Sequence, residues 1–400
     1  MSKLRSLTIM FLSLSLFSII GCETDIDIIA PQKDVTIIYG ILEETKERHY
    51  IRINKAFIGE ESANVLASTQ GVNEYSDNEL QAVVIEFLNG QEIGRYPLNS
   101  EYISSKEDGL FFSDSNKVYY FDADLKISSI DNSYVYRIEC TINVEGEETK
   151  TVSAETEVIG GGLIPITLVK PRIANASSED RGEVDFVANG DYRNSLDITW
   201  QRPAGGVSFT SYYRFYYTEE DIATGDRSRD SLLFTVGTKK VTLRESESAG
   251  EVNFTINPEE FYIRMNTEFE DYDFENPTFN RYASDTLEFF LEVADQTLAT
   301  YIEVNQPSTE ISQERPEYTN VNNGIGVFAS RYLATTRRKV GLTKTTSGRV
   351  FESGTLEELL YSNQVTGLDP ETGAELSRAT SQKGFKVENG RCNDIIQTCR

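Results

Sequence analysis

Histidine, tryptophan and methionine are scarce in this sequence, and the scarcity of histidine excludes several classes of function. The 400 residues include one His, one Trp and three Met. With His49 alone, most zinc sites that use histidine ligands are excluded, and any Ser-His or Cys-His catalytic machinery would depend on that one imidazole. In an alternating strand, His49 lies on the same face as Ile51 and Ile53 and opposite Tyr50. This position favours a structural or partly buried role for His49.

Established catalytic motifs are also missing from the sequence. It contains no G-x-S-x-G nucleophile elbow, no P-loop and no H-E-x-x-H helix. The 64 acidic residues supply so many carboxylate pairs that no single pair indicates glycoside hydrolysis. We therefore expect no enzymatic activity and name no catalytic or metal-binding residue.

Basic residues are in the minority. The chain has 38 Lys+Arg against 64 Asp+Glu, a formal net charge of −26. A protein that binds nucleic acid without sequence preference must neutralise phosphates, so this charge argues against a nucleic-acid partner. It equally disfavours electrostatic binding to an anionic membrane.

A long hydrophobic run occurs at the N-terminus. Residues 7–20 are mostly apolar, follow Lys3 and Arg5, and end at Gly21-Cys22. The run is shorter than the roughly 20 residues of a membrane-spanning helix and fits a secretory signal peptide over residues 1–21. Its end, Ile-Ile-Gly-Cys, resembles the bacterial lipobox, in which the cysteine thiol is diacylated. The alternatives are a plain N-terminal anchor or secretion without a lipid.

Lipidation at Cys22 would attach the mature chain to a membrane without the help of charge. Removing residues 1–21 takes away two of the 38 basic residues and no acids, which leaves 36 − 64 = −28. Residues 22–34 then form a lipidated tether, and acyl chains supply the attachment. The acids after Cys22 resemble export signals of Bacteroidota surface lipoproteins. We expect an outer-membrane lipoprotein on the periplasmic face or the cell surface.

Three further cysteines follow Cys22. Cys392 and Cys399 lie seven positions apart near the C-terminus, and no histidine or second ligand pair accompanies them. In an exported protein this spacing favours a small-loop disulfide over a metal site. Cys140 lies in an alternating segment and is predicted to be a buried hydrophobic residue.

The remaining pattern predicts a mainly β protein with two β-sandwich-like domains and a few short helices. In residues 35–159, an Asn89-Gly90 pair between two apolar runs is typical of a type I′ hairpin, because both turn residues need a positive φ. Strands are also expected at the ranges 35–42, 49–57, 118–122 and 133–144. We interpret this region as a β-sandwich that ends before Gly160-Gly161-Gly162.

Residues 163–345 form the second predicted domain, which is fibronectin-like or otherwise rich in β structure. A buried Trp200 and the alternating aromatics of residues 212–217 are typical of adjacent sandwich strands. Asp295 is expected to cap a helix. Other predicted elements are strands at 231–236 and 240–243 and a helix at 355–360, the last within a C-terminal tail of residues 346–400.

Two apparent motifs have simpler interpretations. Residues 324–329 match G-x-G-x-x-A, but an Asn-rich loop precedes them and a strand pattern follows, so a Gly-rich turn into a strand is favoured over a dinucleotide site. Residues 268–275 contain five carboxylates. They do not match an EF-hand loop, and we favour a solvated acidic loop over a Ca²⁺ site. Their aromatics, Tyr272 and Phe274, join Tyr212 and Tyr213 as a candidate ligand surface.

Four features together resemble a family of Bacteroidota lipoproteins defined only by a domain of unknown function. They are the lipobox with its acids, the strand pair at 35–42 and 50–54, the strand at 133–138, and the turn at 323–328. The resemblance spans residues 23–342. It implies an envelope lipoprotein found beside TonB-dependent outer-membrane receptors, with an N-terminal immunoglobulin-like domain and no catalytic residues to transfer.

The favoured hypothesis is a non-catalytic, lipid-anchored protein that binds a partner or a peptide ligand as an accessory to such a receptor. One alternative is a surface protein that binds or cleaves glycans. Another is a structural or adhesive envelope component.

Overall fold

The protein is mainly β in the computed structural model, as the sequence predicts. The structure describes the following residues: 35–56, 71–104, 115–129, 131–146, 148–160, 172–173, 186–188, 191–192, 195–242, 250–269, 276–306, 318–339, 367–368, 375–376 and 385–387.

The described part of residues 35–160 contains eight strands. They are β1 (Thr36–Leu42), β2 (Arg48–Lys55), β3 (Leu80–Leu88), β4 (Gln91–Pro97), β5 (Asn99–Ile103), β6 (Asn116–Asp122), β7 (Tyr134–Ile142) and β8 (Lys150–Thr156). The Asn89-Gly90 hairpin between β3 and β4 is confirmed, with φ values of 50° and 80°. Both turn residues adopt the positive φ that such a turn requires.

Where the structure describes it, the second part of the chain contains longer strands and two helices. The main elements are β12 (Leu196–Arg202), β13 (Ser208–Asp221), β14 (Arg227–Lys240), β15 (Gly250–Ile256), α4 (Pro258–Glu268), β16 (Phe279–Ala294), α5 (Gln296–Asn305) and β17 (Gly324–Lys339). Short strands complete it: β9 (Arg172–Ile173), β10 (Val187–Ala188), β11 (Asp191–Tyr192), β18 (Gly367–Leu368), β19 (Glu375–Leu376) and β20 (Phe385–Val387).

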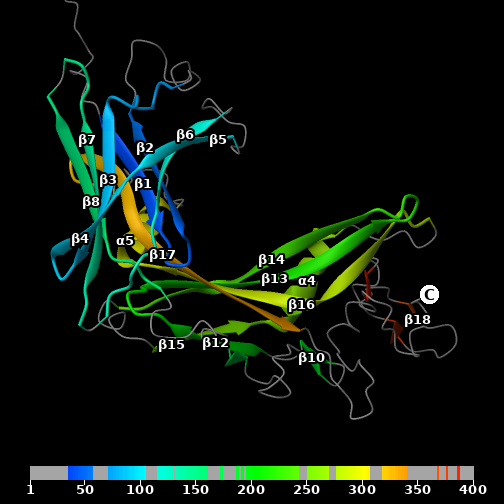
Figure 1. The fold of residues 1–400 in the computed structure, drawn as a ribbon. Coiled ribbons are helices and arrows are strands. Elements are labelled where there is room, and N and C mark those ends of the chain that lie inside the picture. The colour runs from blue at the N-terminus through cyan, green and yellow to red at the C-terminus, as the bar shows by residue number, and fades with distance from the viewer. Residues whose placement is uncertain are drawn as a thin grey trace, which may run out of the picture.

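One large sheet runs through both parts of the chain. Its order is β14-β13-β16-β17-β1-β2-β6-β5, with β20 paired to β16. The joint is a parallel pairing of β1 with the first half of β17, from Thr36 opposite Gly324 to Leu42 opposite Ser330. The second half of β17 pairs with β16. Figure 1 shows β17 leaving the group of N-terminal strands and continuing along β16.

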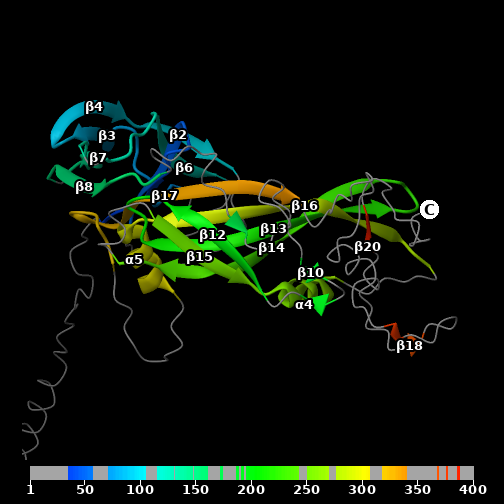
Figure 2. The same ribbon diagram turned by 90° about the horizontal axis from the view of Figure 1, so that it is seen from below.

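The two larger hydrophobic cores of the described residues lie against this sheet. In the first, residues of β1, β2 and β6 pack against the four-stranded sheet β4-β3-β7-β8. In the second, residues of β13 and β16 pack against β12, β15 and α4, which lie alongside the long strands in Figure 2. Trp200 is fully buried, and its Nε1 donates to Ser211 Oγ at 3.1 Å. The prediction of a buried tryptophan between sheets is therefore confirmed, although β12 faces β13 across the core instead of pairing with it.

Two local predictions differ from the structure in their bounds. The strands predicted at 231–236 and from 240 onward are joined in one longer strand, β14, which ends at Lys240, because pairing with β13 continues on both sides of a bulge near Gly237. The predicted Gly-rich turn into a strand is present but shifted by one residue: the turn lies at Asn323, with a φ of 58°, and Gly324 is already strand, paired with Thr36. The helix capped by Asp295 is confirmed as α5, with Asp295 Oδ1 accepting from Leu298 N at 2.7 Å. The predicted helix at 355–360 lies outside the described residues.

Candidate binding face

The structure separates the two neighbouring tyrosines of the predicted ligand surface. Tyr213 is 3% exposed and its ring stacks on Phe234 in the second core, with centroids 4.7 Å apart. Tyr212 points to the opposite side of β13 and stacks on Phe290 at 5.0 Å. This separation follows from strand geometry, because successive side chains alternate between faces.

The other predicted site residues lie outside the part of the chain that the structure describes; they are Cys22, Cys392, Cys399, Tyr272 and Phe274.

Two residues given structural roles by the sequence are placed as expected. His49 is 2% exposed, and its Nε2 lies 3.0 Å from the Ala123 carbonyl oxygen. Burial lowers its imidazole pKa. Cys140 is fully buried in the first core. Among the described residues, no group of three His, Cys, Asp or Glu side chains is arranged to hold a metal ion.

The side of the large sheet that carries Tyr212 is called here the outer face. Strand register identifies its members, because paired residues project on the same side. Tyr212 pairs with Phe290, which pairs with Thr335 of β17. Alternate residues of β17 project on the same side as Thr335, and these include Arg331 and Ile325. Ile325 in turn pairs with Ile37 of β1. The outer face therefore extends across both parts of the chain.

At the N-terminal end, the outer face exposes large apolar side chains. We call this group the apolar patch. It comprises Ile37, Tyr39, Ile41, Tyr50 and Ile325, of which the last four are 40–45% exposed. In antiparallel sheets with one solvated face, that face usually carries polar residues. A contiguous group of exposed Ile and Tyr is instead typical of an interaction surface.

The first turns of α5 lie beside this patch. Leu298 and Ala299 pack on Val327 and Ala329, the outer-face residues of β17 next to the patch. The ring of Tyr301 contacts the ring of Tyr39 edge-on, with centroids 6.2 Å apart. The helix thus forms one border of the apolar patch.

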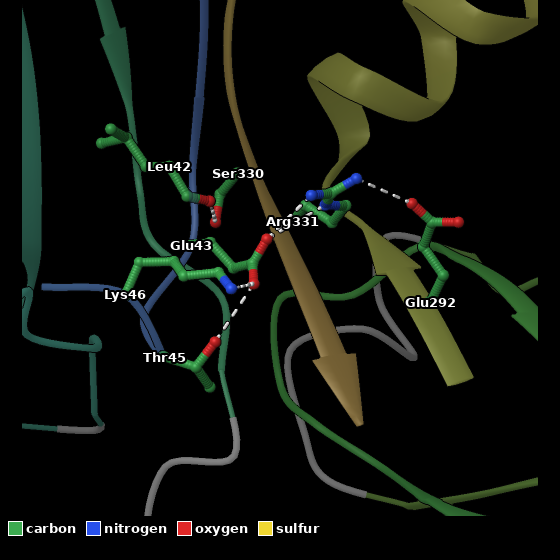
Figure 3. A network of polar contacts seen from close by, with 7 residues as sticks. All are labelled: Leu42, Glu43, Thr45, Lys46, Glu292, Ser330 and Arg331. Carbon is green, nitrogen blue, oxygen red and sulfur yellow. Dashed lines mark hydrogen bonds and ion pairs between the residues drawn. The ribbon is translucent and has the colours of Figure 1, made fainter. Parts of the chain in front are cut away.

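A charged network occupies the middle of the outer face (Figure 3). Arg331 Nη2 lies 2.8 Å from Glu43 Oε2, and its Nη1 lies 3.2 Å from Glu292 Oε1. The Glu43 side chain is buried and also accepts from Thr45 Oγ1 at 3.1 Å. Burial lowers the pKa of the Arg331 guanidinium, but the two neighbouring carboxylates raise it by more. The net effect is a raised pKa.

Beyond this network lies a second group, which we call the aromatic–arginine patch. Its members are Tyr212, Phe290, Arg214, Tyr216, Glu288 and Arg229. The Arg214 guanidinium lies 5.0 Å from the centre of the Phe290 ring, and that of Arg229 lies 4.6 Å from the centre of the Tyr216 ring. Tyr216 donates from its hydroxyl to Glu288. In a chain with a large negative charge, this patch concentrates guanidinium and aromatic groups, which are enriched at protein interfaces.

A buried carboxylate lies close to the charged network. Asp295 Oδ2 accepts from Ser330 N at 2.9 Å and from Thr156 Oγ1 at 3.1 Å. Burial raises the pKa of Asp295 to about 6, and the hydrogen bonds it accepts oppose the shift. This side chain accepts hydrogen bonds from residues of β8, α5 and β17, and so it holds these three elements together between the two cores.

Sequence reasoning missed the apolar patch. The run Thr-Ile-Ile-Tyr-Gly-Ile-Leu in β1 has apolar residues at successive positions instead of alternating ones. That signal usually indicates a strand buried on both sides. In β1, one side is buried in the first core, and Tyr39 and Ile41 are exposed on the other.

Comparisons with known proteins do not identify the chain. No family model and no curated protein matches it. One solved structure, titled "The Enterococcus faecalis MSCRAMM ACE binds its ligands by the collagen Hug Model", is 9% identical, with alignment over 77% of this chain and 94% of that one. Its TM-score of 0.11 is too low to indicate a shared fold. Within the described residues, no helix is long and apolar enough to cross a membrane.

Proposed function

We propose that this protein is a lipid-anchored envelope protein that binds a partner and catalyses no reaction, as an accessory to an outer-membrane TonB-dependent receptor. The observation that carries the proposal is the apolar patch on the outer face. Tyr39, Ile41 and Tyr50 are each 40–45% exposed on a sheet face whose reverse side is fully packed. The anchor at Cys22 and the type of receptor rest on the sequence pattern alone.

The composition of the outer face supports protein binding. Its apolar patch offers the desolvated centre of an interface, and the arginines and tyrosines beyond it are residue types that contribute strongly to binding energy. Arg331 is held between two carboxylates, so the charged middle of the face is fixed before a partner arrives. A preorganised surface loses less conformational entropy on binding.

The test is crosslinking in intact outer membranes with the full chain and two variants. Tyr39→Ser combined with Ile41→Ser removes the apolar patch, and we expect it to lose a crosslinked receptor that the wild type captures. Ile93→Ser combined with Ile263→Ser is the matched control, because these isoleucines are 53% and 55% exposed and lie outside the outer face. Equal crosslinking by both variants, or no specific partner for the wild type, would count against the proposal.

A glycan-binding role is the second candidate, favoured by one observation. The exposed Tyr50 ring lies 6.1 Å from the Tyr120 ring, and the Arg48 guanidinium covers Tyr120 at 4.1 Å. Exposed rings beside a fixed cation suit stacking against sugars. Glycan binding would be lost in Tyr50→Ser and kept in Ile41→Ser, whereas a protein partner would be weakened by both. A glycan array and a hydrolysis screen on these two variants separate the candidates.

A further inference from the structure

The long strand β14 forms one edge of the large sheet. It pairs with β13 from Arg227 to Lys240 and has no second partner strand among the described residues. Its 14 residues span roughly 45 Å at about 3.4 Å per residue. At an edge, alternate backbone N–H and C=O groups point away from the sheet and are available to an added strand.

The centre of β14 lacks the charges that usually protect an edge. Residues 231–238 carry no charge, and within them Leu233 is 40% exposed on the outer face. The reverse side is held in place, because Phe234 is buried in the second core. Native edges are commonly protected by a central lysine, a proline or a short strand. The centre of this edge has neither residue.

Charge is confined to the two ends of β14 and is mainly positive. Arg227 and Arg229 lie at one end with Asp230, and Lys239 and Lys240 lie at the other. Arg227 already pairs with Glu220, and Lys240 with Glu303. Neither Arg229 nor Lys239 forms an ion pair with a carboxylate in the described part of the chain; each lies over an aromatic ring instead.

This distribution disfavours pairing with a second copy. In a fully overlapped antiparallel pair of β14 strands, Arg227 of one copy would face Lys240 of the other, and like charges directly opposite are destabilising. The net charge of −26 on each chain adds a long-range repulsion. The same positive ends would attract a strand whose own ends are acidic.

We propose that β14 accepts a strand from a partner protein: an extended segment with an uncharged, β-forming centre and acidic residues at both ends. The added strand would hydrogen-bond to the open edge over residues 231–235 and place its carboxylates near Arg229 and Lys239. This mode of recognition takes its affinity from main-chain hydrogen bonds and its selectivity from flanking side chains. It uses a different surface from the apolar patch and holds whether or not that patch binds a receptor.

The probe is a synthetic peptide with alternating Thr and Val in the centre and two Asp residues at each end. Binding to the full chain in detergent is followed by fluorescence anisotropy, and hydrogen exchange identifies the protected amides. We expect saturable binding and at least about tenfold slower exchange at amides within residues 231–235. Two control peptides carry either Lys in place of Asp or a central Pro, and both should bind at least about tenfold more weakly.

Charge reversal gives the decisive variant. Arg229→Glu combined with Lys239→Glu should weaken binding of the acidic-ended peptide about tenfold and strengthen that of the Lys-ended peptide. The Tyr39→Ser, Ile41→Ser variant should bind the acidic-ended peptide like the wild type, which separates this inference from the proposed function. The inference is overturned if the acidic-ended peptide does not bind, if the Pro peptide binds equally well, or if protection appears away from β14.

Discussion

Arg331 Nη2 lies 2.8 Å from Glu43 Oε2, and this ion pair joins the middle of β17 to the residue that follows β1. The two residues are 288 positions apart in the chain. Next to them, Ser330 Oγ donates to the Leu42 carbonyl oxygen at 3.2 Å and accepts from Ile159 N at 3.0 Å. Polar contacts of high sequence separation thus hold the two parts of the chain together where the cores meet.

Replacing Arg331 by alanine should destabilise the protein. Among the described residues, the buried Glu43 carboxylate would lose its closest partner and keep Thr45 and the more distant Lys46. We expect the free energy of unfolding to fall by about 1–3 kcal/mol, measured by urea denaturation. Arg95→Ala is the control, because its ion pair with Glu92 is exposed, and it should change stability little. Equal effects of the two substitutions would show that the joint does not depend on this ion pair.

Asp295 should make stability depend on pH in an unusual direction. Its pKa in the folded protein is about 6, above the ordinary value of 3.8, so the folded state binds the proton more tightly than the unfolded state does. Its contribution to stability is therefore fully present below about pH 4 and is lost as the pH rises through about 6.

The Asp295→Asn variant isolates this contribution from those of other carboxylates. Measured between pH 4 and pH 6, the unfolding free energy of the wild type relative to the variant should increase by about 2 kcal/mol as the pH falls. A difference that stays constant over this range, or increases with rising pH, would contradict the assignment. Because Asp122 and Glu92 have lowered pKa values and act in the opposite direction, the comparison is made between variants and not on the wild type alone.

Gly326 should not tolerate a side chain. Its φ is +114°, and a Cβ at this position would lie 2.0 Å from the Ile38 carbonyl oxygen on the paired strand β1. Gly326→Ala should therefore separate β1 from β17 and reduce the unfolding free energy by more than about 3 kcal/mol. Gly225→Ala is the matched control, since Gly225 also has a positive φ but faces open space, and about 1 kcal/mol is expected there. Equal losses in thermal or urea denaturation would refute the steric explanation.

Cys140 should be unreactive in the folded protein. It is fully buried, and burial raises the pKa of its thiol to about 12, so almost no thiolate is present near neutral pH. Alkylation with iodoacetamide, followed by peptide mass spectrometry, should label Cys140 only after urea is added. Labelling of this residue in the absence of denaturant would show that the first core opens readily.

The sequence predicted features that depend on a few neighbouring residues. Asn89-Gly90 specifies its hairpin because both residues accept a positive φ, and Asp295 specifies the start of α5 because its carboxylate accepts from a helix N–H. Trp200 and Cys140 were correctly placed in cores from the alternation of apolar residues around them. Each of these depends on covalent geometry or on burial within one short segment.

Only the tertiary structure decided which strands share a sheet and which faces remain exposed. Periodicity within 212–217 shows that Tyr212 and Tyr213 lie on opposite faces, but it does not tell which of the two faces is covered by α4 and β15. The parallel pairing of β1 with β17 joins residues almost 290 positions apart, and no local pattern specifies it. The apolar patch and the open edge of β14 both follow from the order of strands in the large sheet. A side chain or a strand edge is exposed only if no other segment packs on it. The sequence by itself determined the local elements and their buried sides, whereas long-range pairing created the surfaces on which binding is proposed.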